Sequence, residues 1–167
     1  MNAPTQPPCS NLPLQSSGVP PSAPGEVQSI VRCGQAVMRF YAALDAGNLA
    51  EVAGMMADDG VWHRQGKVLQ GPAEVLSALR NRPAGRVTAH LVNNLVIDVS
   101  DDCKTATARY MLFVFRHDRD PGGTGPAPLA GSLLSITLTT DLWRDVPAQG
   151  WRAVLKEGQA VFSHGSS

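Results

Sequence analysis

The sequence contains no continuous apolar run of the roughly 18 residues that a transmembrane helix needs. It has no excess charge of either sign, because 14 Lys and Arg residues balance 14 Asp and Glu residues. A balanced charge argues against nucleic-acid binding, which uses a basic surface, and against a polybasic membrane contact. We therefore expect a cytoplasmic protein that binds neither nucleic acid nor membranes.

Cysteines are few, and Cys9, Cys33 and Cys103 are an odd number whose spacing fits no disulfide framework or zinc motif. Reduced thiols are the default for such a set. The glycine-rich run at 122–125 lacks the Lys and Ser or Thr of a phosphate-binding loop. No Gly-x-Ser-x-Gly elbow occurs either. These absences argue against a nucleotide site and against a Ser or Cys nucleophile.

More than half of the 13 prolines lie in the first 24 residues. This stretch is also rich in Ser, Gln and Asn and carries no charged side chain. Such a composition buries too little apolar surface to offset the entropy lost on ordering. It also lacks the basic and apolar regions of a signal peptide. We predict a disordered tail over 1–25, a folded domain over 26–163 and a disordered end over 164–167.

In the first half of the predicted domain, apolar residues recur at helical steps of three and four. Glycine follows the first helical pattern, Asp-Asp-Gly follows the second, and Gly-Pro opens the third, as is typical of helix ends and starts. A short segment with a Gln-Gly turn reads as a hairpin. The sequence predicts helices over about 26–46, 48–57 and 71–82, with the hairpin at 61–70.

Beyond residue 85 the apolar period changes from 3.6 to 2, which predicts strands at 86–99, 105–117, 132–145 and 151–162. Short links between sequence neighbours favour an antiparallel meander. The fold class is therefore α+β: a curved antiparallel sheet of about four long strands plus a short hairpin, wrapped over three helices. Such an arrangement leaves an internal, mostly apolar pocket between its layers.

Five segments occur in a familiar order, namely 40–48, 55–62, 71–74, 82–94 and 141–152. Together they resemble the SnoaL-like branch of the NTF2-like superfamily, whose fold is a cystatin-like α+β cone, and the resemblance spans about 26–163. Its members include scytalone dehydratase, ketosteroid isomerase, polyketide cyclases, bile-acid dehydratases, dioxygenase small subunits and proteins that only bind or assemble. The resemblance therefore implies a fold without deciding a function.

The candidate catalytic residues are His90, Tyr41 and Asp45. His90 lies in a strand-like run, and Tyr41 and Asp45 are four residues apart, so they share one helix face. The resemblance to the dehydratases implies that the histidine acts as a base, the tyrosine polarises a carbonyl and the aspartate orients the histidine. The alternatives are a hydrogen-bonded core histidine, a packed tyrosine and an ordinary helix-end aspartate.

Trp62, Asn94 and Arg109 are the candidate ligand-binding residues. Trp62 lies on the hairpin and is predicted to form a pocket wall. Asn94 is four residues after His90, so a regular strand points both to one face, unless a bulge intervenes. Arg109 can bind an acidic substrate only if its strand face is the inner one, and the outer face is the commoner place for such an arginine.

No metal or other cofactor is expected, since His63, His90 and His117 lack the spacing of a helical zinc site. The sequence predicts a cofactor-independent lyase or isomerase that abstracts a proton next to a carbonyl of a hydrophobic or cyclic molecule. Some relatives carry an acidic residue on the strand at 105–116 that this chain lacks. The alternatives are a ligand-binding or assembly protein and a dioxygenase small subunit. A homodimer through the sheet face is also expected.

Overall fold

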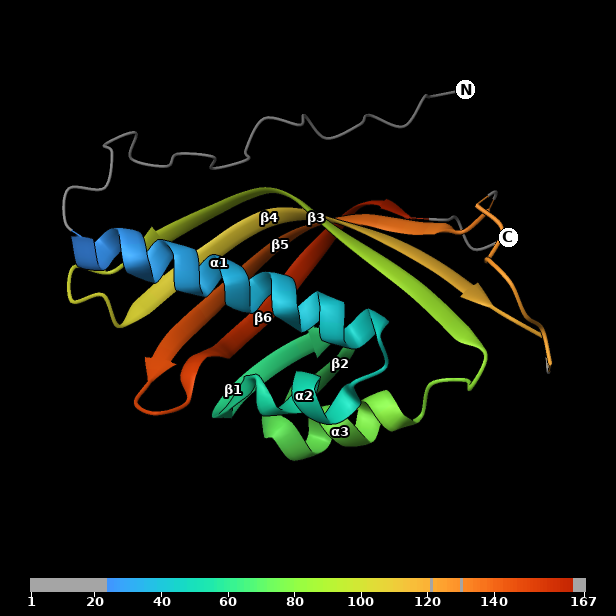
Figure 1. Ribbon diagram of the computed structural model, residues 1–167, viewed down its shortest axis with the longest axis horizontal. Coiled ribbons are helices and arrows are strands. Elements are labelled where there is room, and N and C mark those ends of the chain that lie inside the picture. The colour runs from blue at the N-terminus through green and yellow to red at the C-terminus, as the bar shows by residue number, and fades with distance from the viewer. Residues whose placement is uncertain (1–23, 121, 130, 164–167) are drawn as a thin grey trace, which may run out of the picture.

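In the computed structural model, which describes residues 24–120, 122–129 and 131–163, three helices lie on one face of a curved six-stranded sheet (Figure 1). Most of the predicted tail at 1–25 and all of the predicted end at 164–167 lie outside the described residues. In chain order the elements are α1 (Pro24–Asp45), α2 (Leu49–Gly54), β1 (Met56–Arg64), β2 (Lys67–Gln70), α3 (Gly71–Arg80), β3 (Arg86–Val99), β4 (Thr105–Asp118), β5 (Leu133–Val146) and β6 (Gly150–Ser163).

Helix α1 crosses the concave face of the sheet (Figure 1). Its buried stripe includes Cys33, Val37, Phe40 and Leu44, which follow one another at steps of three and four. The helix ends at Asp45, and Gly47 then adopts a positive φ of 77° that a residue with a side chain rarely takes. Within the described residues, no helix is long and apolar enough to cross a membrane.

The strands are hydrogen-bonded in the order β2-β1-β6-β5-β4-β3. All neighbouring pairs are antiparallel except β1 and β6, which run parallel. The predicted α+β class is confirmed, and each of the four long strands begins and ends within one residue of its predicted bounds. Helix α3 packs beside β1 and β2, so it closes the end of the sheet that α1 does not reach (Figure 1).

The boundary between α2 and β1 differs from the prediction. The helix ends at Gly54, and β1 already begins at Met56 rather than at residue 61. The Asp58-Asp59-Gly60 segment is therefore part of a strand and not a helix-ending turn. Gly60 passes so close to β6 that an added Cβ would lie 2.5 Å from the carbonyl oxygen of Ala153. The glycine that we interpreted as a turn signal is needed for this close approach.

Two of the register shifts in the sheet bear directly on which side chains face the cavity. The β3–β4 register shifts between Asn93 and Val96, and the β5–β6 register shifts where Leu142 pairs with Leu155 but the next residue of β5 pairs with Ala153. A bulge of this kind reverses the alternation of inward and outward side chains on its strand. Both shifts affect the composition of the cavity.

Candidate functional site

A cavity of about 330 Å³ lies between the helices and the inner face of the sheet. Its wall includes three of the six predicted site residues, Tyr41, Trp62 and His90. Trp62 faces inward and packs edge-to-face against Phe40, with the ring centroids 5.3 Å apart. The opposite wall comes from the inner faces of β5 and β6, where Thr137, Thr139, Asp141, Lys156 and Gly158 contribute.

Asp45 and His90 form a close pair at this wall. The Nδ1 atom of His90 lies 2.5 Å from Oδ1 of Asp45, and the backbone N–H of His90 donates to Oδ2 at 2.7 Å. The histidine side chain is 10 % exposed and lines the cavity, whereas Asp45 lies behind it. Because the carboxylate engages Nδ1, the other ring nitrogen, Nε2, is the one available to a ligand.

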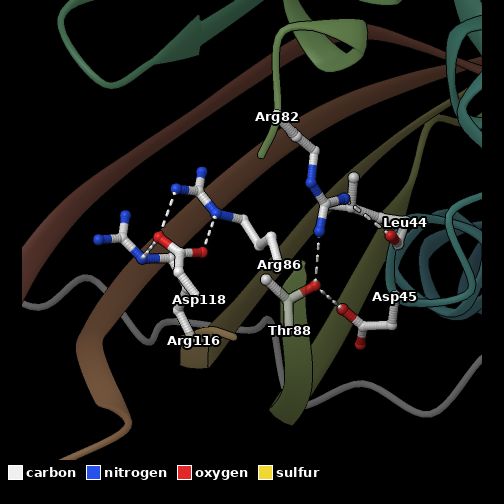
Figure 2. A network of polar contacts seen from close by, with 7 residues as sticks. All are labelled: Leu44, Asp45, Arg82, Arg86, Thr88, Arg116 and Asp118. Carbon is white, nitrogen blue, oxygen red and sulfur yellow. Dashed lines mark hydrogen bonds and ion pairs between the residues drawn. The ribbon is translucent and has the colours of Figure 1, made fainter. Parts of the chain in front are cut away.

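Thr88 on β3 and Arg82 in the loop after α3 hold this pair in place. Thr88, two residues before His90 on β3, donates its hydroxyl to Oδ1 of Asp45 at 2.8 Å. Arg82 donates to that hydroxyl oxygen at 3.1 Å and to the carbonyl oxygen of Leu44 at 3.0 Å (Figure 2). At the end of α1, where helix carbonyls lack helical partners, the cation is thus a second donor to the Leu44 carbonyl, which also accepts from the backbone N–H of Gly47. The end of α1 is thereby fixed to the start of β3.

Burial alone would raise the pKa of the Asp45 carboxyl, but the hydrogen bonds and charge of His90 and the hydrogen bond from Thr88 outweigh it. The pKa of Asp45 therefore lies below its ordinary value. With its pKa below the ordinary value, the carboxyl is ionised at neutral pH and can accept hydrogen bonds at both oxygens. An ionised Asp45 can hold His90 in the tautomer that leaves Nε2 unprotonated.

Tyr41 stacks on His90, with ring centroids 5.3 Å apart and an interplanar angle of 27°. Its hydroxyl lies 2.7 Å from the hydroxyl of Tyr110, which in turn donates to Asp141 at 2.7 Å. A hydroxyl has a single proton. Because the proton of Tyr110 goes to the carboxylate of Asp141, the proton of Tyr41 goes to Tyr110. The Tyr41 hydroxyl therefore donates its proton to another protein residue and not to a ligand.

The chain of hydrogen bonds ends at a buried ion pair between Lys156 and Asp141, whose side chains are 1 % and 0 % exposed. The two residues face each other across β5 and β6. The Lys156 Nζ atom also lies 4.3 Å from the ring centroid of Phe40, which is the distance of a cation–π contact. Burial raises the pKa of Asp141 and lowers that of Lys156, and each charge opposes the shift of its partner.

The structure does not bring Asn94 to the cavity, contrary to the prediction. It lies at the bulge of β3 with a positive φ of 52°, and its side chain is exposed and contacts Met111. Arg109 is also outside the cavity wall, because it belongs to the outward set of β4. Its guanidinium bonds to Asp98 of the neighbouring strand. The irregular register explains the first error, and ordinary alternation explains the second.

Several polar residues of the cavity were not predicted. Asp141 and Thr139 occur in a run of alternating polar side chains on β5, which indicates one shared face but not that this face is the inner one. Among the described residues, the hydroxyl of Thr139 and Oδ1 of Asp141 are buried without a hydrogen-bond partner. Lys156 gave no signal, because alternation from Trp151 and Ala153 would place it outside.

Four arginines complete the wall, and we call them the arginine rim: Arg64, Arg82, Arg86 and Arg116. All four are partly exposed, unlike the Lys156–Asp141 pair. Arg86 binds Asp118 through two hydrogen bonds of 2.7 and 2.8 Å, and Arg116 lies 3.9 Å from the same carboxylate (Figure 2). The rim was absent from the predicted site, since its residues come from β1, β3, β4 and the loop after α3.

No cluster of three or more His, Cys, Asp or Glu side chains in the described parts of the chain is placed to hold a metal ion. His63 and His90 both contribute to the cavity wall, but His117 does not. The polar groups of the cavity wall therefore include the imidazoles of His63 and His90, the guanidinium groups of the rim and the hydroxyls of Thr137 and Thr139.

Comparisons with solved structures agree on the fold. An NTF2-like protein with a cystatin-like fold from Novosphingobium aromaticivorans is 22 % identical, with a TM-score of 0.60 over 84 % of each chain. A Catenulispora acidiphila protein in complex with S-DNPA is 19 % identical, with a TM-score of 0.60 over 78 % of this chain and 91 % of that one. A candidate scytalone dehydratase from N. aromaticivorans is 13 % identical, with a TM-score of 0.63 over 86 % and 91 %.

At these identities the likeness to solved structures shows the fold alone. No curated protein matches the chain by sequence. The profile of the SnoaL-like domain, by contrast, matches residues 25–155, which cover nearly all of the helices and most of the cavity wall and of the sheet. The predicted resemblance is confirmed: the chain belongs to the SnoaL-like domain family of the NTF2-like, cystatin-like fold.

Proposed function

We propose that the protein is a cofactor-independent lyase or isomerase in which His90 removes a proton next to a carbonyl of a small cyclic molecule. The observation that carries this proposal is the Asp45–His90 pair at the cavity wall, with 2.5 Å between Nδ1 and the carboxylate. An aspartate in this position fixes the tautomer and the orientation of the imidazole. Nε2 then faces the space that a substrate would occupy.

The proposed reaction needs one base and one stabiliser of negative charge. Nε2 of His90 takes the proton, and the C–H electron pair forms the double bond of an enolate. The Thr139 hydroxyl, buried at the cavity wall without a partner among the described residues, can donate to the enolate oxygen. When the enolate re-forms its carbonyl, a β-hydroxyl leaves and takes the proton back from His90 as water.

In this proposal Tyr41 and Asp45 are positioning residues. Tyr41 acts by stacking on the imidazole, since its hydroxyl proton is engaged by Tyr110. Asp45 acts by orienting the ring and stabilising its protonated form. Trp62 contributes an aromatic wall, as we expected for a hydrophobic or cyclic ligand. The likeness to a candidate scytalone dehydratase supports a cyclic β-hydroxy ketone as the substrate class.

The test uses 3-hydroxy-1-tetralone, a bicyclic β-hydroxy ketone whose dehydration yields 1-naphthol. We expect the wild type to accelerate naphthol formation and to exchange the proton at C2 with deuterium from D2O, which is detected by NMR. His90→Gln should lower both rates by about 10²- to 10⁴-fold, the usual contribution of a general base. His117→Gln, which changes a histidine outside the cavity, is the matched control and should keep both rates.

Two results would contradict the proposal. One is a wild type that neither exchanges the C2 proton nor forms naphthol faster than buffer. The other is a His90→Gln variant as active as wild type, with an unchanged unfolding midpoint. Exchange without dehydration would instead support the isomerase form of the proposal, because proton removal would occur without a leaving group.

A ligand-binding protein without catalysis is the second candidate function. The observation in its favour is that a relative of the same fold was crystallised in complex with S-DNPA. The tetralone experiment separates the two candidates, because a binding protein would retain the ketone without exchanging its proton. A saturable NMR shift of the tetralone together with a buffer-like exchange rate would favour this second candidate.

The expected homodimer through the sheet remains a proposal. Its support is the outer face of the sheet, where Leu91, Leu142 and Phe162 are exposed. Exposed apolar side chains on one face are typical of an interaction surface. Sedimentation equilibrium tests the proposal: we expect a dimer that Leu142→Lys converts to monomer, and a monomeric wild type would overturn it.

A further inference from the structure

The charge around the cavity differs from the charge of the whole chain. The net charge of the sequence is zero. In contrast, the four guanidinium groups of the rim lie near three carboxylates among the described residues: Asp118 beside the wall, Glu157 on it and Asp45 behind His90. Lys156 and Asp141 neutralise each other deeper in the cavity. The partly exposed part of the wall is therefore positive within a neutral protein.

Two of the four rim arginines have no ion-pair partner. Arg86 and Arg116 share Asp118, but within the described residues neither Arg64 nor Arg82 lies within 4.0 Å of a carboxylate oxygen. Among the described residues, the Arg64 guanidinium has one hydrogen bond, to the neighbouring Gln65, and lies over the ring of Trp62, so most of its donors are free there. Free guanidinium donors on a cavity wall are suited to a planar or tetrahedral oxyanion.

These guanidinium groups are also close enough to repel one another. Burial lowers the pKa of Arg64, and the charges of Arg82 and Arg86 lower it further. Burial and the charge of Arg86 also lower the pKa of Arg82, and the carboxylates of Asp45 and Asp118 oppose that shift in part. Like charges gathered at a cavity destabilise the empty protein and favour an anion that relieves the repulsion. Arginines that have shifted pKa values and line a cavity therefore indicate a binding site more strongly than arginines dispersed over a surface.

The geometry of β3 connects the rim to the proposed base. Arg86, Thr88 and His90 are alternate residues of one strand, and all three line the cavity. Alternate residues lie about 7 Å apart along a strand. A molecule of one or two rings lying along β3 can therefore place a reacting carbon at His90 and a charged substituent among the arginines. A cavity of about 330 Å³ accommodates a molecule of this size.

We propose that the arginine rim binds an oxyanion, a carboxylate or a phosphate ester, so that the cavity favours a cyclic organic anion over the neutral molecule of the same skeleton. The position of the reacting carbon rests on the function proposed above, but anion binding does not. Arg64 is the main specificity-determining residue, because among the described residues it has neither a carboxylate partner, as Arg86 and Arg116 have, nor bonds to two other elements, as Arg82 has. Arg82 is less suitable for a test, since it also bonds to Leu44 and Thr88.

The test compares three ligands of one bicyclic skeleton by isothermal titration calorimetry: 2-naphthoate, 2-naphthyl phosphate and the neutral 2-naphthamide. We expect wild type to bind at least one of the two anions about tenfold or more tightly than the amide, as charge-assisted bonds to guanidinium groups provide. Arg64→Gln should remove most of this preference and leave amide binding unchanged. The tighter of the two anions identifies the oxyanion as a carboxylate or a phosphate.

The matched control is Arg39→Gln, which removes one positive charge from the exposed surface of α1, away from the cavity wall. It should leave all three affinities unchanged, and Arg64→Gln should unfold at the wild-type temperature. Equal binding of anions and amide by wild type would overturn the proposal. Equal weakening of all three ligands by Arg64→Gln, or no measurable binding of either anion, would overturn it as well.

The same titration separates this proposal from the proposed reaction. His90→Gln removes the proposed base but leaves the rim intact, so we expect it to retain the wild-type preference for an anion. If that preference persists while no tetralone proton exchanges, the anion site stands and the proton-transfer function fails. If exchange occurs without any preference for an anion, the function stands and the anion site fails.

Discussion

The cavity wall holds two groups of charged residues that differ in how completely their charges are paired. Lys156 and Asp141 are fully buried, face each other across two strands and are further bonded to Tyr110. The rim arginines are partly exposed, and two of them have no carboxylate partner within the described residues. A buried charge must be paired to be tolerated, whereas a solvated one need not be.

This difference suggests that the buried pair stabilises the fold and that the arginine rim binds the ligand. The buried pair has its partners inside the protein, so it fixes the shape of the inner wall and the position of Tyr41. The arginine rim has guanidinium N–H donors without a protein partner among the described residues, so a ligand can hydrogen-bond to them. Removing a charge from the buried pair should therefore act on folding, and removing one from the rim should act on binding.

The largest effect is expected for Lys156→Met. This substitution leaves the Asp141 carboxylate buried without its cation, which typically costs about 3–5 kcal/mol. The free energy of unfolding, measured by urea denaturation at pH 7, should fall by that amount. The double variant Lys156→Met/Asp141→Leu is the control and should recover most of the loss, because it removes both charges. A single variant as stable as wild type would show that the pair is not buried in solution.

Arg82 combines features of both groups: it belongs to the arginine rim, but it also donates hydrogen bonds to Leu44 and Thr88. Arg82→Gln breaks the bonds to the Leu44 carbonyl and the Thr88 hydroxyl. We expect a loss of about 1–2 kcal/mol in the free energy of unfolding, as for hydrogen bonds from a charged donor. Arg64→Gln is the matched control and should cost less than about 0.5 kcal/mol, like other surface changes. Equal losses would contradict a special structural role for Arg82.

Most of the fold followed from the sequence because its signals are local. The stripe of α1, the proline that opens α3 and the period-2 strands all depend on residues close in the chain. The resemblance of their segments to a known family also singled out Asp45 and His90, which the structure places in contact, and their catalytic roles stay a prediction. The error at the α2–β1 boundary arose from Gly60, whose role is a tertiary approach to β6 that no local pattern reveals.

The rest of the site depends on sheet irregularities and on distant elements. The bulge in β3 removes Asn94 from the cavity, and the register shift on β6 brings Lys156 into it. Strict alternation predicts the opposite for both residues. The arginine rim combines residues from separate strands and a loop, so it exists only after the sheet has formed. Register shifts and long-range neighbours are the two features that periodicity alone cannot predict.

A smaller effect is expected for Asp45 in acid. Its pKa is lowered in the folded protein, so it stabilises the fold above the unfolded pKa of about 3.9. This contribution is lost as the pH falls through the lower, folded pKa. The stability gap between wild type and Asp45→Asn, measured by urea denaturation, should therefore be larger at pH 7 than at pH 3. A gap that widens in acid would contradict the ionised Asp45.

The smallest effect is expected for the Arg86–Asp118 pair of the rim. Its side chains are 17 % and 40 % exposed, and pairs near the surface contribute between 0 and about 1 kcal/mol. Arg86→Gln should lower the free energy of unfolding within that range, and 1 M NaCl should reduce the difference by screening. A loss as large as that of Lys156→Met would mean that the rim supports the fold as the buried pair does. Its guanidinium groups would then be structural, and a ligand could not engage them without weakening the protein.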